Sequence, residues 1–130
     1  MSSLQIITLM FLHGLFDFLL QDRETAKKKS SNFKYLLGHL FILYNGLLIW
    51  AALFGNLGFK NSLIFALTNT ILHGIIDWNL WSLYKLSVVR RFKEADITFQ
   101  YWEDSWFYNF IMLDQLLHGI CYVVLFALIR

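Results

Sequence analysis

Residues 71–78, ILHGIIDW, decide how the rest of the chain is interpreted because they place ionisable side chains inside an apolar run. His73 and Asp77 are four residues apart, so an α-helix brings the imidazole and the carboxylate onto one face. The same pairing recurs in two other apolar runs, where the partners are His13 with Asp17 and Asp114 with His118. Segments long enough to cross a bilayer rarely hold such groups without a functional reason, which predicts one shared site.

The composition predicts a membrane protein. Of the 130 residues, 58% are hydrophobic and only 15% are charged, whereas soluble domains average roughly 45–50% apolar and 25% charged residues. The chain has no proline and no change of composition along its length, so we expect a single membrane domain over 1–130. A net charge of +2 without a basic face argues against nucleic acid as a partner.

Four apolar runs have about the length that crosses a bilayer, roughly 20 residues in a helix. These predicted spans cover residues 4–21, 35–54, 63–84 and 107–129. Nine of the eleven Lys and Arg residues fall in the connecting segments 22–34 and 85–106, and the positive-inside rule makes these loops cytoplasmic. The predicted fold is therefore all-α, an integral four-helix bundle of the cell (inner) membrane with both termini on the non-cytoplasmic side.

The predicted topology also places the ionisable groups at one depth. Counted from the cytoplasmic helix ends, the carboxylates and His39 lie roughly 7–11 Å into the membrane and the other histidines roughly 14–16 Å. This agreement predicts that the groups converge in the cytoplasmic half of the bundle. Each histidine also has an adjacent glycine, which predicts close helix packing around the site at Gly14, Gly38, Gly74 and Gly119.

The side chains on these helices predict a metal site. Imidazole nitrogens and carboxylate oxygens suit zinc, manganese or iron, with zinc expected, and they suffice for one ion with open positions or for two ions. The predicted metal ligands are His13, Asp17, His73, Asp77 and His118. Asp114 and His39 are predicted as further ligands or as catalytic proton-transfer groups. Nearby polar side chains are expected to orient the ligands, namely Gln21, Asn69, Thr70, Gln115, Cys121 and Tyr122.

Two other interpretations of these groups stay open. They can form a path for ions or protons, or protonated Asp and neutral His can hydrogen-bond between helices and fix only their packing, at roughly 0.6–2 kcal/mol per bond. The basic loops have two interpretations as well. They are typical topology signals that also contact anionic headgroups, and the alternative is that they hold an anionic substrate at the mouth of the site.

The order of the motifs resembles that of a known family. The chain reads HGLFDFLLQ over 13–21, then a lysine-rich loop and His39, then HGIID over 73–77 and LDQLLH over 113–118. This arrangement covers nearly the whole chain and resembles small bacterial and phage polytopic membrane proteins catalogued as a domain of unknown function. The resemblance implies a shared polar site and names no reaction. More loosely, the His and Asp pairs look like those of small membrane-bound metal-dependent hydrolases, although the chain lacks an HxxxH or HExxH motif.

The leading functional prediction is an integral membrane protein with an intramembrane metal site that hydrolyses a lipid or lipid-linked substrate. The metal would activate water, and an unligated Asp or His would act as general base. The alternative is a non-enzymatic protein, either a small ion or metal carrier or a phage-type protein that binds a membrane partner. The expected partners are membrane lipid, an anionic or lipid-linked substrate at the basic cytoplasmic face, and a second copy of the chain in a homo-oligomer.

Overall fold

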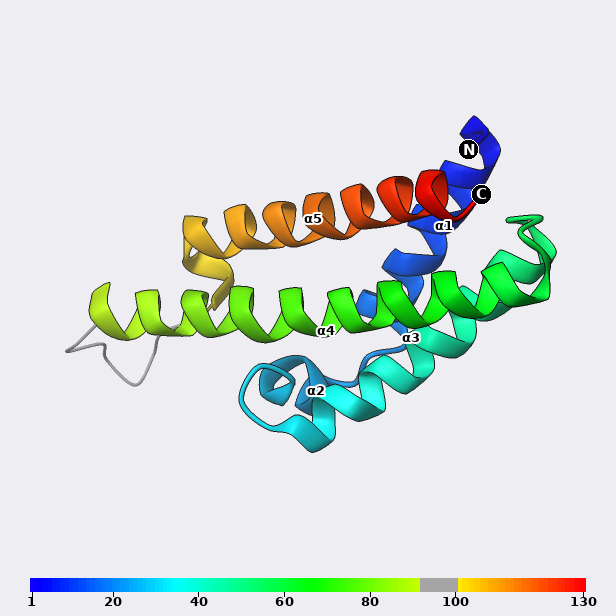
Figure 1. The fold of residues 1–130 in the computed structure, drawn as a ribbon. Helices are drawn as coiled ribbons and strands as arrows, with labels where there is room; N and C mark the ends of the chain where they lie inside the picture. Colours follow the sequence, from blue (N-terminus) through cyan, green and yellow to red (C-terminus); the bar gives the residue numbers. More distant parts are fainter. Residues whose placement is uncertain (92–100) are drawn as a thin grey trace.

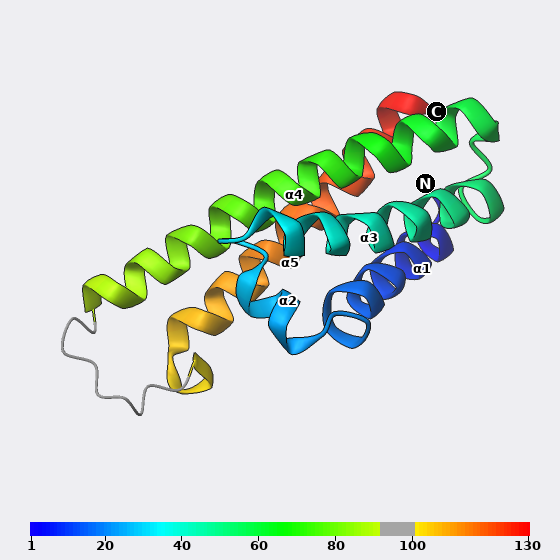
Figure 2. The same cartoon turned by 90° about the horizontal axis from the view of Figure 1, so that it is seen from below.

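The computed structural model describes residues 1–91 and 101–130, and this part of the chain is helical with short connections. The elements in chain order are α1 (Ser3–Gly14), a π-helical turn (Leu15–Leu19), α2 (Arg23–Lys28), α3 (Phe33–Leu53), α4 (Gly58–Arg91), a 3₁₀ turn (Tyr101–Glu103) and α5 (Ser105–Ile129). Helix α4 packs against both α3 and α5. Both termini lie at the end of the bundle where α3 turns into α4 (Figure 1 and Figure 2).

The all-α prediction is confirmed for the described residues. In this part of the chain, α3 and α5 are long and apolar enough to cross a membrane, judged by length and composition alone. The apolar helix at the N-terminus is shorter. Helix α4 continues to Arg91, beyond the predicted end of its apolar run at residue 84. Within the predicted loop 85–106, residues 92–100 lie outside the described part of the chain.

Side-chain caps start four of the helices in the described part of the chain. A side-chain oxygen accepts a hydrogen bond from a backbone N–H of the first turn at Ser2 before α1, Asp22 before α2, Asn32 before α3 and Asp104 before α5. Such caps satisfy N–H groups that have no partner within the helix. The connection from α3 to α4 depends on two residues with left-handed backbone, Asn56 with φ 51° and Gly58 with φ 71°. The turn therefore stays short and the two helices run antiparallel.

The interior of the bundle has an apolar half and a polar half. The apolar half lies toward the termini and contains an aromatic contact between three helices, in which Trp50 of α3, Phe65 of α4 and Phe126 of α5 have ring centroids 5.8–6.0 Å apart. All three side chains are buried. The other half of the interior holds the buried His and Asp side chains described below.

Close helix contacts do not follow the predicted pattern of glycines. A Cβ at Gly46 of α3 would overlap the ring of Phe16, so this glycine lets the π-helical turn dock against α3. A Cβ at Gly74 would come within 2.8 Å of a leucine side chain of α3. At Gly14 and Gly38 a Cβ would meet nothing within 4 Å. The prediction of close packing is therefore wrong for those two glycines, whose helix faces are open at these positions.

Asp104 ties the start of α5 to the end of α4. Its carboxylate accepts hydrogen bonds from the Arg91 guanidinium at 2.8 and 2.9 Å and from the Tyr84 hydroxyl at 3.0 Å. It also caps α5 by accepting a hydrogen bond from the Trp106 backbone N–H at 3.1 Å. The hydrogen bonds from Arg91 hold the pKa of Asp104 below its usual range. The carboxylate is therefore ionised at neutral pH and holds the two helix ends together.

We expect Gly46→Ala to lower the free energy of unfolding by about 1–3 kcal/mol, because the added methyl group overlaps the Phe16 ring in a packed contact. Gly38→Ala is the matched control on the same helix, where open space and better helix propensity predict a gain of about 0.5–1 kcal/mol. Thermal unfolding of both variants in one detergent measures the difference. Equal stability of the two variants would contradict the close contact at Gly46.

Candidate metal centre

The structure brings all the predicted His and Asp side chains together in the polar half of the interior. They come from α1, the π-helical turn, α3, α4 and α5, and each is at most 5% exposed. The members of this polar cluster are His13, Asp17, His39, His73, Asp77, Asp114 and His118. Residues up to 105 positions apart in the sequence, from 13 to 118, thus form one buried group.

Four atoms of the polar cluster lie at the spacing of a metal-coordination shell. His39 Nε2 is 3.1 Å from Asp17 Oδ1, 3.0 Å from His73 Nε2 and 3.5 Å from Asp77 Oδ2. His73 Nε2 is 3.5 Å from Asp17 Oδ1 and 3.1 Å from Asp77 Oδ2. Ligand atoms of a tetrahedral zinc site with bonds of about 2.0–2.1 Å lie roughly 3.3–3.4 Å apart. We call these side chains the four-ligand set, and they can hold a metal ion.

The two carboxylates of the four-ligand set also face a second group of ligands. Asp17 Oδ2 is 3.2 Å from His13 Nε2, and Asp77 Oδ1 is 3.8 Å from His118 Nε2. His118 Nε2 is in turn 3.5 Å from Asp114 Oδ1. Asp17, Asp114 and His118 can together offer three ligand atoms within 4.8 Å of one another. Each shared carboxylate therefore points one oxygen to each group, as carboxylates that bridge two metal ions do.

Asp17 lies within the π-helical turn rather than on the regular α-helix that its spacing from His13 suggests. The turn closes with a hydrogen bond from the Leu20 N–H to the Leu15 carbonyl at 2.9 Å. Single π-helical turns occur often at functional sites, because the extra residue in the turn changes the direction of a side chain. Here the turn places Asp17 with its two oxygens near different histidines.

Several atoms of the polar cluster lack the hydrogen bonds that burial demands. Among the described residues, His13 Nε2, His118 Nε2 and Asp114 Oδ1 are buried and have no hydrogen-bond partner of acceptable geometry. A buried polar atom without a partner costs about 1–3 kcal/mol. A cation held by Asp17, Asp114 and His118 would satisfy two of these atoms, and one held by His13, His73 and His118 would satisfy His13 Nε2.

Lys29 is a member of the site that the sequence interpretation missed. Its side chain is buried, and Nζ lies 2.9 Å from Asp77 Oδ2 and 3.8 Å from Asp17 Oδ1. Burial lowers the pKa of Lys29, but the carboxylates of Asp77 and Asp17 outweigh burial and raise it above the usual value. The sequence presents Lys29 as one of three successive basic residues, and only the position at the end of α2 turns it inward.

The predicted orienting residues differ in what they contact. The Tyr122 hydroxyl lies 3.0 Å from His13 Nδ1, and Gln115 donates hydrogen bonds to Asp17 at 3.3 Å and Asp114 at 3.1 Å. These contacts orient cluster side chains, as partners of metal ligands do. The Asn69 amide instead donates to the carbonyl one turn back on its own helix, at 2.9 Å.

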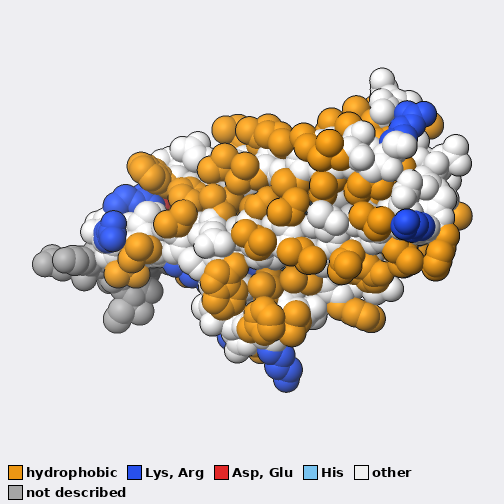
Figure 3. All heavy atoms as spheres, in the orientation of Figure 1, with side chains coloured by type: hydrophobic (Ala, Val, Ile, Leu, Met, Phe, Trp, Pro, Cys, Tyr) orange, Lys and Arg blue, Asp and Glu red, His pale blue; other side chains and the backbone are white. Residues whose placement is uncertain are grey.

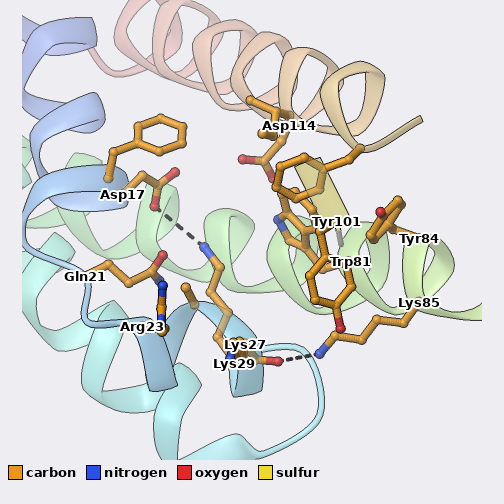
Figure 4. A pocket seen from close by; sticks show the side chains of 14 residues that line it. Asp17, Gln21, Arg23, Lys27, Lys29, Trp81, Tyr84, Lys85, Tyr101 and Asp114 are labelled. Atoms are coloured by element: carbon orange, nitrogen blue, oxygen red, sulfur yellow. Dashed lines mark hydrogen bonds and ion pairs between the residues drawn. The ribbon is translucent and has the colours of Figure 1, made fainter. Parts of the chain in front are cut away.

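A cavity of about 440 Å³ opens beside the polar cluster. Asp17, Asp114 and Lys29 line its inner part, and Gln21 lies close by (Figure 4). Basic side chains from α2 and α4 line it as well, namely Arg23, Lys27 and Lys85. The remaining wall is aromatic and aliphatic. The polar cluster therefore borders this cavity through Asp17 and Asp114.

A family model described as "Protein of unknown function (DUF3307)" matches residues 5–130. The chain belongs to this family. The resemblance drawn from the order of the His and Asp motifs is thereby confirmed, and the motifs lie within the matched region. The looser likeness to metal-dependent hydrolases has no support in this match. Searches of curated proteins and of solved structures found no match.

We expect Lys29→Met to destabilise the metal-free protein by about 3–5 kcal/mol, because it leaves two buried carboxylates without their cation. Zinc should restore the stability, since a bound cation replaces the lost ammonium, and the variant should bind zinc at least about tenfold more tightly than the parent. Denaturant unfolding with chelator and with zinc measures both effects. The matched control is Lys28→Met, whose exposed ion pair with Glu24 is worth at most about 1 kcal/mol.

Proposed function

We propose that this chain is an integral membrane metalloprotein that holds two divalent metal ions, preferably zinc, and hydrolyses a lipid or lipid-linked ester. The observation that carries the proposal is that the two carboxylate oxygens of Asp17 face different histidines, and that those of Asp77 do so as well. One oxygen of each carboxylate faces His39 and His73, and the other faces His13 or His118. Two-metal hydrolases use such shared ligands to hold ions about 3.5–4 Å apart.

The outer surface supports a position within the membrane. Large apolar side chains are exposed along the helices, for example Phe11 at 71%, Phe41 at 71% and Leu128 at 75%. One face of the molecule is hydrophobic through its middle, and its Lys and Arg side chains lie at the periphery (Figure 3). Soluble monomers rarely expose apolar patches larger than a few hundred Å². In a bilayer the same side chains contact lipid.

The basic connections support the orientation. Nine of the eleven Lys and Arg residues lie in the segments 22–34 and 85–106. In the predicted topology these segments are cytoplasmic, and the two termini lie on the opposite side. The polar cluster and its cavity then belong to the cytoplasmic half of the bundle, in the cell membrane.

The two groups of ligands suit different roles. The four-ligand set fills a tetrahedral shell, which is typical of a structural zinc ion, whereas the three-ligand group of Asp17, Asp114 and His118 would need a further ligand, either Asp77 Oδ1 or a substrate in the cavity. That three-ligand group contains Asp17 and Asp114, which also line the cavity. His39, predicted as a proton-transfer group, is better placed as a ligand because its Nε2 lies within 3.5 Å of three other ligand atoms.

In the proposed reaction water attacks the ester group of a lipid, the bond from that group to the alcohol oxygen breaks, and the alcohol leaves with the proton that the water gave up. The metal ions supply Lewis acidity and activate water. The residues of the chain position and exchange protons. Gln115 holds the carboxylates of Asp17 and Asp114 in place, and Tyr122 orients His13. Asp114 borders both the cavity and His118, so the carboxylate oxygen that does not bind metal would be placed to accept a proton from water.

A carrier or partner-binding role is the second candidate. It is favoured by the four-ligand set alone, because a filled tetrahedral shell buried at 5% exposure or less suits storage or structural binding. The two roles differ in turnover. A hydrolase releases product from a lipid ester and loses this activity with Asp114→Asn, whereas a carrier moves the metal across a liposome membrane and releases no product.

The metal content of the purified protein tests the proposal. We expect two zinc ions per chain in the parent by elemental analysis, and about one in Asp114→Asn, because the three-ligand group loses a charged ligand. His39→Ala should lose the ion of the four-ligand set. Asp22→Asn is the matched control, since its carboxylate is exposed and caps α2, and it should retain the parent's content.

The outcomes separate the parts of the proposal. One ion per chain that is lost in His39→Ala and kept in Asp114→Asn would reduce the centre to the four-ligand set and favour the carrier role. A parent without bound metal after dialysis against zinc would refute the metal site. Circular dichroism of each variant shows whether it still folds.

A further inference from the structure

We infer that the cavity beside the polar cluster binds a phosphate-bearing amphiphile, with the phosphate at its basic polar end and the apolar part along its aromatic wall. The inference names the substrate class of the same site and so rests on the proposed function. It is carried by the cations, the hydrogen-bond donors and the apolar wall that meet in this one cavity.

The cavity carries an excess of positive charge toward an anionic ligand. Lys27 and Arg23 come from α2, Lys85 comes from α4, and Lys29 lies deeper (Figure 4). The Lys85 ammonium donates a hydrogen bond to the Lys27 carbonyl at 2.6 Å, which holds it over the end of α2. Lysine and arginine side chains grouped around one cavity are the usual protein partners of phosphate oxygens.

Two buried hydrogen-bond donors also line this cavity without partners. Among the described residues, Gln21 Nε2 and Trp81 Nε1 are buried and have no hydrogen-bond partner. A ligand rich in acceptor oxygens offers partners to such donors, because each phosphate oxygen accepts more than one hydrogen bond. A purely hydrocarbon ligand would leave both unsatisfied, at about 1–3 kcal/mol each. The donors therefore favour a polar, acceptor-rich head on the ligand.

The charge of the polar cluster makes binding of this ligand depend on the metal ions of the proposed function. With neutral histidines, three aspartates and Lys29 carry a formal charge of −2. Without metal, Asp17 and Asp114 at the inner wall would repel a phosphate. Two divalent ions reverse this charge to +2, which an ionised phosphate ester offsets. Binding of the ligand is therefore expected to depend on the metal.

The apolar part of the cavity wall favours an amphiphile over free phosphate as the ligand. Phe18, Phe107 and Ile111 line it together with the aromatic rings of Trp81 and Tyr84. A volume of about 440 Å³ is within the roughly 300–1,000 Å³ of small-molecule sites. This volume accommodates a headgroup and the first part of a chain, so the tail of a lipid would extend into the surrounding bilayer.

Titration calorimetry on the purified full chain tests the inference. The probes are short-chain phosphatidic acid, short-chain phosphatidylcholine with a zwitterionic head, and inorganic phosphate, each with zinc-loaded and with chelator-treated protein. We expect the zinc-loaded parent to bind phosphatidic acid at least about tenfold more tightly than either other probe, and Lys85→Gln to weaken that binding about tenfold. Lys60→Gln, an exposed lysine at the start of α4 on the opposite end, is the matched control and should bind as the parent does.

Each outcome bears on one claim. Equal affinity for phosphatidic acid and phosphatidylcholine, or no effect of Lys85→Gln, overturns the phosphate site. Equal affinity for phosphatidic acid and inorganic phosphate overturns the amphiphile. If metal content is as proposed and phosphatidic acid does not bind, this inference fails and the metal centre stands. If phosphatidic acid binds equally well to protein without metal, the headgroup site stands and its dependence on the metal is wrong.

Discussion

The arrangement of the bundle depends on the electrostatics of carboxylates held away from water. Asp17, Asp77 and Asp114 are each at most 5% exposed, and an isolated ionised carboxylate in such surroundings is strongly unfavourable. Lys29 offsets one charge through its contact with Asp77. The histidines surround the other carboxylates, and a formal charge of −2 remains when the histidines are neutral. The requirement to compensate these carboxylates explains why polar groups from α1, α3, α4 and α5 meet in one cluster.

The packing of the helices holds the polar cluster together. The aromatic contact of Trp50, Phe65 and Phe126 holds the opposite half of the bundle together, and Gly46 lets the π-helical turn approach α3. Asp104 links the ends of α4 and α5 where the cavity lies. Rigid elements on both sides thereby hold the polar side chains within coordination distance, which a site on mobile loops could not do.

Much of the site was predictable from spacing alone. The four-residue intervals and the predicted common depth identify His13, His73, His118 and their partner carboxylates, because an ionisable group in an apolar helix is costly to bury without partners. His39 stands alone on its helix, and its place among the four converging atoms is evident only from the fold. Lys29 was not predictable, because a lysine in a basic loop is normally solvated and nothing local distinguishes it from Lys28.

The sequence by itself determined the helical class, the four apolar runs and the set of side chains that meet in the polar cluster, since periodicity and hydropathy are local properties. Only the tertiary structure decided how these side chains divide between the four-ligand set and the second group of ligands. The π-helical turn at Asp17, the inward course of Lys29 and the cavity against α2 arise from contacts between segments far apart in the chain. Spacing along a helix shows which residues share a face, and it cannot show which oxygen of a carboxylate faces which neighbour.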